Sequence, residues 1–173
     1  MTKKEFVRRI AKEKKDLLQD FLDLLIKKKI PYCIIGGLAV NAYTEPVVSL
    51  DLDVVIVVER LKELLGSLKH TYKIKSFANS INISSPFSDL RVQIQTDPRY
   101  QKFIRRARIK EVLGYKLRVG SKKDVLQGKI WAAQDRTRRP SKRQKDLSDI
   151  LRLLEKDRNL ASLVPVSLKK KLF

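Results

Sequence analysis

The sequence predicts an α+β domain with a small mixed sheet, helices on one face of the sheet and a helical extension at its C-terminal end. The 173 residues suit one domain, and 43% of them are hydrophobic, which is enough for a packed core. Strand-like apolar stretches occur between residues 32 and 119, and from Ser121 onward the period becomes helical. We therefore expect residues 1–120 to form the core, including an N-terminal helix, and residues 121–173 to form an extension packed on it as a single compact unit.

The N-terminal part predicts one helix followed by two strands around a short helix. Thr2 and Glu5 form a capping-box pattern, so a helix is expected to begin there, to pack mainly after Leu17 and to end at Pro31. The segments expected next are a buried strand over 32–35, a short helix over 38–43 and an apolar strand over 50–58.

The remaining elements follow from turn residues and periodicity. The expected segments are a helix over 60–68, strands over 71–77, 80–83 and 90–96, a helical turn over 98–106, a hairpin over 109–113 and 115–119, and helices over 121–134 and 140–156. The last two helices begin at capping patterns, Ser121 with Asp124 and Ser141 with Gln144.

Charge is the unusual property of the composition. The chain has 39 Lys and Arg against 19 Asp and Glu, a net charge of +20, and residues 99–149 carry 17 basic and five acidic side chains, +12. Such a balance indicates a polyanionic partner such as nucleic acid or nucleotide. One cysteine and one histidine exclude a disulfide framework and a zinc ligand set. No apolar run approaches the ~20 residues of a membrane span, so we expect a cytoplasmic protein with no membrane partner.

The strongest chemical pattern pairs two glycines with two aspartates. Gly36-Gly37 follows an apolar strand, and after thirteen residues comes Asp51-Leu52-Asp53 at the head of another. Alternation along a strand places Asp51 and Asp53 on one face, roughly 6.5 Å apart, where they repel unless a cation lies between them. Two such carboxylates suit Mg²⁺, and a glycine pair before a helix leaves backbone N–H groups open to phosphate. Together they predict a nucleoside triphosphate site.

This pattern resembles the nucleotidyltransferase superfamily of the DNA polymerase beta type. Within it, the chain is similar to small bacterial and archaeal nucleotidyltransferases related to the AbiEii abortive-infection toxins, and the similarity includes residues 91–100, 125–131 and 138–149. The resemblance implies that Asp51 and Asp53 bind Mg²⁺ or Mn²⁺ that carries an NTP, and that Gly36 and Gly37 hold phosphate. Ser49 stands where relatives often have a threonine.

One departure from the family pattern affects catalysis. Active members usually carry a third carboxylate on a neighbouring strand, and here Gln93 occupies that place. An amide is a poorer Mg²⁺ ligand and cannot act as a general base. Asp97 shares a strand face with Gln93, but it lies four residues further along, roughly 13 Å on an ideal strand. Gln93 and Asp97 are therefore accessory candidates.

The two C-terminal helices supply further candidates. In the resembled group a Lys-Asp-x-x-Asp helix packs beside the nucleotide, so Lys129 and Lys145 would contact phosphate, with Asp146 and Asp149 as accessory acids. The alternative is that Asp146 stabilises its helix start and the lysines are solvated. Basic residues expected to form an RNA or DNA surface are Arg105, Arg106, Arg108, Arg136, Arg138, Arg139, Lys142 and Arg143.

The leading hypothesis is a metal-dependent nucleotidyltransferase that moves a nucleoside monophosphate from an NTP to an acceptor hydroxyl, with RNA such as tRNA as the acceptor. One alternative is a catalytically degenerate protein that binds nucleotide or nucleic acid without turnover, because of Gln93. The other is the toxin component of a toxin–antitoxin pair, whose partner would be an antitoxin protein.

Overall fold

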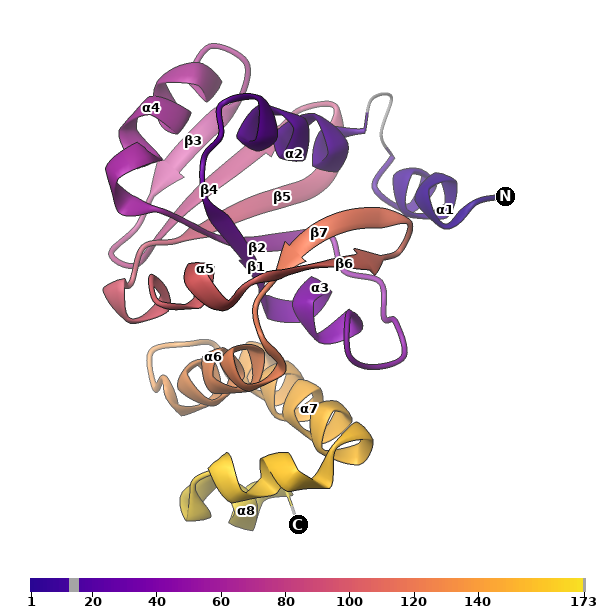
Figure 1. The fold of residues 1–173 in the computed structure, drawn as a ribbon, viewed down its shortest axis with the longest axis vertical. Helices are drawn as coiled ribbons and strands as arrows, with labels where there is room; N and C mark the ends of the chain where they lie inside the picture. The colour runs from indigo at the N-terminus through magenta and orange to yellow at the C-terminus, as the bar shows by residue number, and fades with distance from the viewer. Residues whose placement is uncertain (13–15, 173) are drawn as a thin grey trace.

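A seven-stranded mixed sheet forms the centre of the molecule in the computed structural model, which describes residues 1–12 and 16–172 (Figure 1). Across the sheet the strands are β3 (Lys73–Ser76), β4 (Ser80–Ser85), β5 (Ser88–Gln95), β2 (Asp51–Ile56), β1 (Tyr32–Ile35), β7 (Tyr115–Val119) and β6 (Arg108–Val112). The β1–β7 and β2–β5 pairs are parallel and the others are antiparallel. The predicted mixed sheet is confirmed.

Helices precede, interrupt and follow the strands. They are α1 (Lys3–Ile10), α2 (Leu17–Lys27), α3 (Gly36–Asn41), α4 (Val58–Leu68), α5 (Phe103–Arg106), α6 (Lys122–Gln134), α7 (Pro140–Lys156) and α8 (Val166–Leu172), with 3-10 helices η1 (Pro98–Tyr100) and η2 (Arg158–Leu163). Helices α6 to α8 gather at one end of the molecule, beyond α3, as Figure 1 shows. The predicted α+β class is confirmed, while α8 and η2 were not anticipated.

The two faces of the sheet are covered unequally. Leu52 and Val54 of β2 are fully buried in the main core, which also contains the apolar faces of α2 and α4. On the opposite face a smaller cluster packs Cys33 and Val55 against Phe103 of α5. Burial raises the pKa of the Cys33 thiol to about 12, so this residue belongs to the core, as its place in an apolar strand predicts. The rest of that face is open to the site described below.

The single N-terminal helix predicted before Pro31 is wrong, because the chain forms α1 and α2 instead. Lys12, just after α1, has a φ of 53°, a left-handed conformation that a helix cannot continue. Asp16 then caps α2 by accepting a 3.0 Å hydrogen bond from the backbone N–H of Gln19. The spacing of Asp16 and Gln19 is a capping signal that the sequence contains.

The longest helix, α7, carries several charged residues, and no helix in the described part of the chain combines the length and apolar composition needed to cross a membrane.

Candidate active site

A row of polar side chains crosses three neighbouring strands on the open face. Asp53 of β2 lies beside Gln93 of β5 in parallel register, and Gln93 lies opposite Asn82 of β4. Asp51, two residues before Asp53, lies beside Arg91 in the next row. Because side chains alternate along a strand, burial of Leu52 and Val54 in the core places these polar residues on the other face.

Gly36 lets β1 and α3 approach the carboxylate of Asp53 closely. Its φ is 68°, which favours glycine, and a Cβ at this position would collide with the Asp53 carboxylate and lie 2.8 Å from its Cβ. Gly37 is less constrained, since its Cβ would lie 3.7 Å from the Ser49 Oγ. The glycine pair and the acids therefore meet in space, and Ser49 joins them while its Oγ accepts a 3.3 Å hydrogen bond from the Asp51 N–H.

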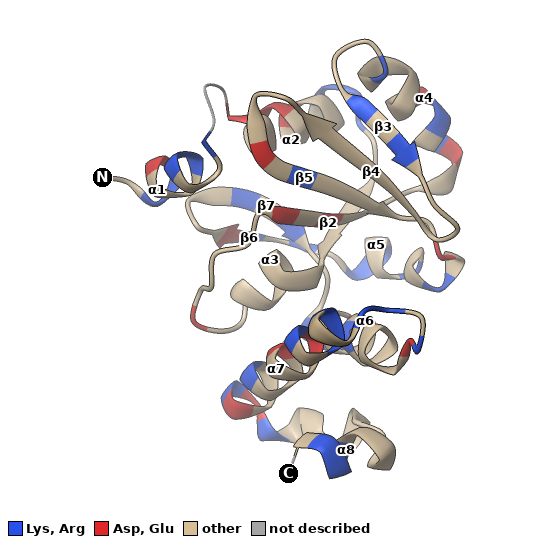
Figure 2. Cartoon of the chain, turned by 180° about the vertical axis from the view of Figure 1, so that it is seen from behind, with Lys and Arg blue, Asp and Glu red and all other residues tan. Residues whose placement is uncertain are grey.

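Asp51 is paired with two cations from different elements. Arg91 Nη2 lies 3.0 Å from one carboxylate oxygen, and Lys142 Nζ of α7 lies 3.2 Å from the other. Lys142 therefore links the start of α7 to the middle of the sheet. Figure 2 shows this arrangement of charge, with acidic residues on β2 and basic residues on β5, the α6–α7 loop and α7.

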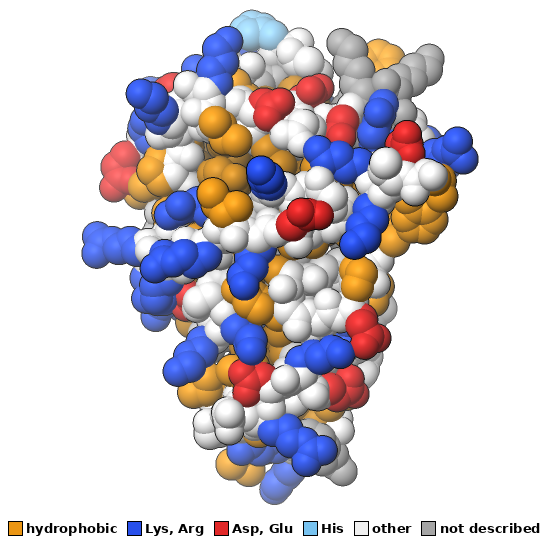
Figure 3. Space-filling model, turned by 45° about the vertical axis from the view of Figure 1, so that its right-hand side comes forward, with side chains coloured by type: hydrophobic (Ala, Val, Ile, Leu, Met, Phe, Trp, Pro, Cys, Tyr) orange, Lys and Arg blue, Asp and Glu red, His pale blue; other side chains and the backbone are white. Residues whose placement is uncertain are grey.

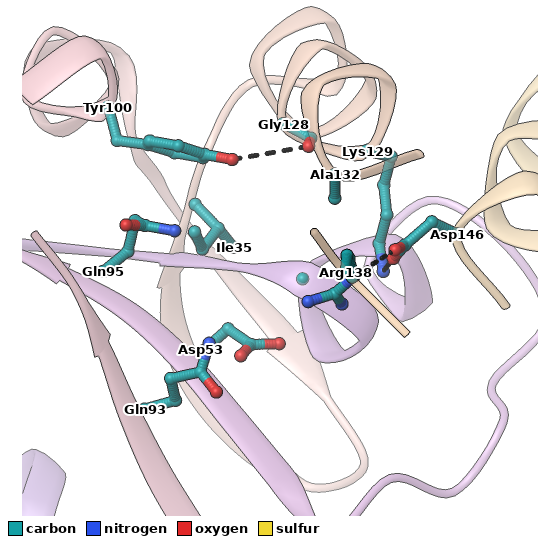
Figure 4. Close-up of a pocket in the computed structure, with 11 residues that line it drawn as sticks. Ile35, Asp53, Gln93, Gln95, Tyr100, Gly128, Lys129, Ala132, Arg138 and Asp146 are labelled. Atoms are coloured by element: carbon teal, nitrogen blue, oxygen red, sulfur yellow. Dashed lines mark hydrogen bonds and ion pairs between the residues drawn. The ribbon is translucent and has the colours of Figure 1, made fainter. Parts of the chain in front are cut away.

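Asp53 points into a pocket of about 60 Å³ that we call the Asp53 pocket (Figure 4). The residues that line it are Ile35, Gly36, Asp53, Gln93, Gln95, Tyr100, Gly128, Lys129, Ala132, Arg138 and Asp146. Asp53 forms no hydrogen bond or ion pair within residues 1–12 and 16–172. Burial raises its pKa, an effect that Lys129 opposes and Asp51 reinforces. A cation beside Asp53 would offset this cost of carrying charge.

The donor set fits one hard divalent cation. Asp51 and Asp53 present carboxylate oxygens on one face, and Gln93 adds an amide oxygen, while phosphate and water would complete the coordination. In the described residues, no three His, Cys, Asp or Glu side chains are grouped so that they could hold a metal. Beside the two carboxylates of β2, the neighbouring strand β5 offers the amide of Gln93.

Lys129 lies at the centre of a buried ion network between α6 and α7. Its Nζ lies 3.0 Å from Asp146 Oδ1 and 2.6 Å from Asp149 Oδ2, and all three side chains are less than a tenth exposed. Arg138 Nε binds the other oxygen of Asp146 at 2.7 Å, and Arg152 Nη1 binds the other oxygen of Asp149 at 2.8 Å. Burial would lower the pKa of Lys129, but Asp149 and Asp146 outweigh it and raise that pKa, so the lysine stays charged.

Two larger depressions adjoin the Asp53 pocket. We call the first the Trp131 hollow, about 480 Å³, which includes Gln95, Asp97, Arg99, Tyr100 and Trp131. The second is the Arg91 hollow, about 730 Å³, which is lined by Asp51, Phe77, Ser80, Asn82, Arg91, Gln93, Thr137, Arg138, Arg139 and Lys142. Arg138 lines all three depressions, so they meet at this residue.

Three other predicted residues, Lys145, Asp97 and Asp149, do not line the Asp53 pocket. Lys145 is exposed on α7 and lines none of the three depressions. Asp97 lies in the Trp131 hollow, where its carboxylate is bound by Arg99, 2.6 Å from Nη2, and this arginine lowers its pKa. Asp149 is enclosed by Lys129 and Arg152.

The predicted basic surface divides into two groups. Arg138, Arg139 and Lys142 line the Arg91 hollow, whereas Arg106 pairs with Asp124 of α6 at 2.6 Å. Members that line none of the depressions are Arg105, Arg106, Arg108, Arg136 and Arg143. Figure 3 shows Lys and Arg side chains spread over the whole visible face with single acidic residues among them, so charge alone does not mark the site.

Sequence reasoning missed Arg91, Gln95 and Tyr100 as parts of the site. Arg91 faces Asp51 only because β5 pairs with β2 in register, and a parallel pairing leaves no local sequence signal. Tyr100 reaches the pocket from η1, where it contacts Trp131 edge-on at 5.0 Å and donates a 3.4 Å hydrogen bond to the Gly128 carbonyl.

No protein-family model matches the chain, and no curated protein sequence matches it. Its structure is similar to that of the antibiotic-resistance factor ANT(2'')-Ia, with a TM-score of 0.62 at 12% identity over 90% of both chains. It is also similar to the lincosamide antibiotic adenylyltransferase LnuA, with a TM-score of 0.56 at 14% identity over 82% of this chain and 99% of that one. A third similar structure is an antigenic nucleotidyltransferase-like protein from Paracoccidioides brasiliensis, with a TM-score of 0.53 at 18% identity over 86% of this chain and 75% of that one. At these identities the likeness defines the fold, and the chain has the nucleotidyltransferase fold that its sequence predicts.

Proposed function

We propose that this protein is a metal-dependent nucleotidyltransferase that transfers a nucleoside monophosphate from an NTP to an acceptor hydroxyl on RNA. The observation that carries the proposal is the close packing of Gly36 against Asp53, a carboxylate that has no partner in the described residues and faces a pocket. Asp51 lies on the same face and is paired with Arg91 and Lys142, while Lys129 and Arg138 line the pocket that Asp53 faces. A polymerase-beta-like fold and a kinship with AbiEii-type toxins are consistent with this arrangement.

The chemistry assigned to the site is phosphoryl transfer. The acceptor oxygen bonds to the α-phosphorus, the α–β bridging P–O bond breaks and pyrophosphate leaves, with the acceptor proton passing to solvent. A Mg²⁺ or Mn²⁺ ion, when bound, would neutralise the developing phosphate charge. Asp51 and Asp53 would hold this ion, and the backbone N–H groups at Gly36 and Gly37 would face the phosphates.

An RNA acceptor is supported by the Arg91 hollow. Four of its lining residues are basic, namely Arg91, Arg138, Arg139 and Lys142, and Asp51 is the one acid among the described residues that line it. Phe77 is 49% exposed there, and the Oδ1 atom of Asn82 is buried without a hydrogen-bond partner in the described chain. Cations, an exposed aromatic ring and an amide suit single-stranded RNA. The four basic side chains would repel a polycationic small molecule.

The deciding experiment measures NTP binding by calorimetry with Mg²⁺. The wild type is compared with the Asp51→Asn/Asp53→Asn variant, which keeps the side-chain shapes and removes both charges. We expect the variant to bind at least about 100-fold more weakly, since the loss of two ion-bound carboxylates exceeds ~2.7 kcal/mol. Equal binding by both proteins would eliminate the site. Labelled NTPs and a tRNA pool then test transfer itself.

Gln93 favours a second candidate function, a protein that binds nucleotide or nucleic acid without turnover. The strand beside Asp53 carries the Gln93 amide in place of an acid, and Asp146, the other carboxylate that lines the Asp53 pocket, is already paired with Lys129 and Arg138. This candidate predicts NTP binding that depends on Asp53 with no labelled product. Transfer by the wild type that the double Asn variant abolishes would exclude it.

A further inference from the structure

Among the residues that the structure describes, Arg138 is the one that lines all three depressions around the site. It belongs to the loop between α6 and α7, and its side chain is 33% exposed, so it is neither solvated like its neighbours Arg136 and Arg139 nor enclosed like Lys129. Figure 4 shows its guanidinium between Asp146 and Asp53. A ligand spanning the Asp53 pocket and either hollow would pass this side chain.

The guanidinium is held by one nitrogen. Arg138 Nε donates a 2.7 Å hydrogen bond to Asp146 Oδ2, and its two Nη nitrogens form no hydrogen bond with any residue the structure describes. Asp146 is 1% exposed, and its other oxygen is fixed by Lys129 Nζ at 3.0 Å. The hydrogen bond from Nε to Asp146 therefore fixes one edge of the guanidinium, and the two Nη nitrogens are left to face the depressions.

We propose that Arg138 binds the phosphates of the NTP through its Nη nitrogens and that Asp146, fixed by Lys129, is the residue that positions it. This inference rests on the proposed function. It gives Lys129 a different role from phosphate contact, because both carboxylates near its Nζ already neutralise it. Lys129 and Asp146 act through Arg138, so they are positioning residues.

The geometry requires an arginine. A guanidinium is a planar fork whose Nε can bind one carboxylate while its Nη nitrogens bind a phosphate on the far side. A lysine offers one nitrogen at the end of a flexible chain, so it cannot satisfy Asp146 and a phosphate with the same fixed geometry. Arg138→Lys should therefore behave like Arg138→Ala in ligand binding, although it keeps the charge.

The first test measures binding of inorganic tripolyphosphate with Mg²⁺ by calorimetry, because this probe has no base or ribose and needs no turnover. We expect Arg138→Ala and Arg138→Lys to weaken binding at least about 10-fold, the size typical of a lost charge-assisted contact. Arg158→Ala is the matched control, since Arg158 is exposed in the C-terminal helices and lines none of the three depressions. Its affinity should stay within about twofold of wild type.

The second test separates positioning from mere stability. Asp146→Asn is made in the wild-type and in the Arg138→Ala background, and both affinity and melting temperature are measured. We expect Asp146→Asn to lower the melting temperature in both backgrounds, because it disturbs the pairing with Lys129. It should weaken tripolyphosphate binding only when Arg138 is present.

Each outcome decides the matter. If Arg138→Ala binds like Arg158→Ala, or if Asp146→Asn weakens binding equally in both backgrounds, the inference is overturned. It fails alone if the Asp51→Asn/Asp53→Asn variant loses NTP binding while Arg138→Ala retains it. If the wild type binds neither tripolyphosphate nor NTP, the proposed function and this inference both fail.

Discussion

Two pairs of closely spaced aspartates lie at the site, and one member of each, Asp53 and Asp146, lines the Asp53 pocket in opposite surroundings. Asp51 and Asp53 lie on a strand, and Asp53 has no ion-pair partner in the described chain although burial raises its pKa. Asp146 and Asp149 lie on α7, where Lys129, Arg138 and Arg152 neutralise every carboxylate oxygen. In the strand pair, Asp51 and Asp53, the Asp53 carboxylate holds charge that a ligand can use, whereas both carboxylates of the helix pair, Asp146 and Asp149, are neutralised within the protein.

Buried acids near a site therefore need not act on its ligand. The helix pair is more deeply buried, yet its ion pairs join α6 to α7 and direct Arg138 toward the pocket. The strand pair is less buried, and Asp51 forms ion pairs with Arg91 of β5 and Lys142 of α7. Removing a charge from each pair should change the free energy of unfolding in opposite directions.

The largest effect is expected for Lys129→Met, which keeps the shape of the side chain and removes the charge at the centre of the helix pair. Removing one partner of a buried ion pair leaves charge uncompensated, so the free energy of unfolding should fall by about 3 kcal/mol or more. Because the pKa of Lys129 is raised, its stabilising contribution is complete at neutral pH and is lost only as the pH rises through that pKa. Urea unfolding at pH 7 measures the change.

Lys145→Met is the matched control, since Lys145 is exposed on α7. Its effect should stay within about 0.5 kcal/mol, as is usual for surface substitutions. Equal losses for the two lysine variants would mean that the helix pair does not depend on Lys129.

Gly36→Ala, at the residue that packs against Asp53, is expected to lower the free energy of unfolding by less than Lys129→Met. The added methyl group meets the Asp53 carboxylate, and the φ of 68° disfavours alanine, so stability should fall by about 2 kcal/mol. Displacement of Asp53 should also weaken binding of Mg²⁺-NTP. Unfolding and calorimetry on the same variant measure both effects.

Gly66→Ala controls for the change of residue type. Gly66 lies in α4 with nothing within 4 Å of its Cβ position, so alanine should stabilise the helix by roughly 0.5–1 kcal/mol. If Gly36→Ala proved as harmless, the close approach of Gly36 to Asp53 would not exist in solution.

Much of the fold was predictable because local signals and the global fold agree. The strand over 32–35 and the hairpin strand over 115–119 match β1 and β7, since apolar runs and turn residues mark their ends. The proximity of Gly36 to Asp53 was also predictable, because the glycine pair and the two acids occur at a fixed spacing in the sequence. The break between α1 and α2 was missed, because apolar residues recur at helical spacing on both sides of it and the capping signal at Asp16 was overlooked.

The internal pairing of the site could not be read from the sequence. Lys129 and Asp146 are 17 residues apart on different helices, and Lys142 and Asp51 are 91 apart. Only the packing of α6 on α7, and of α7 beside the sheet, decides which cation meets which acid. The sequence therefore indicated the charged residues without separating those that face a ligand from those that neutralise one another.

The smallest effect, and the one of opposite sign, is expected for Asp53→Asn in metal-free protein. The substitution removes a charge that is disfavoured by burial and has no ion-pair partner in the described residues, so it should raise stability by about 1 kcal/mol at pH 7. Asp149→Asn removes a paired charge from the helix pair and should instead lower stability. Urea unfolding of both variants at pH 7 in the presence of a chelator makes the comparison.

The stability difference between Asp53→Asn and wild type should depend on pH. An acid whose pKa is higher in the folded than in the unfolded state costs stability wherever both states are ionised, and the cost disappears once the pH falls below the unfolded value of about 4. The advantage of Asp53→Asn over wild type should therefore be full at neutral pH and shrink as the pH is lowered through the raised pKa of Asp53. An advantage that grows in acid would mean that Asp53 is stabilised as a carboxylate by the fold, and the contrast between the strand pair and the helix pair would then fail.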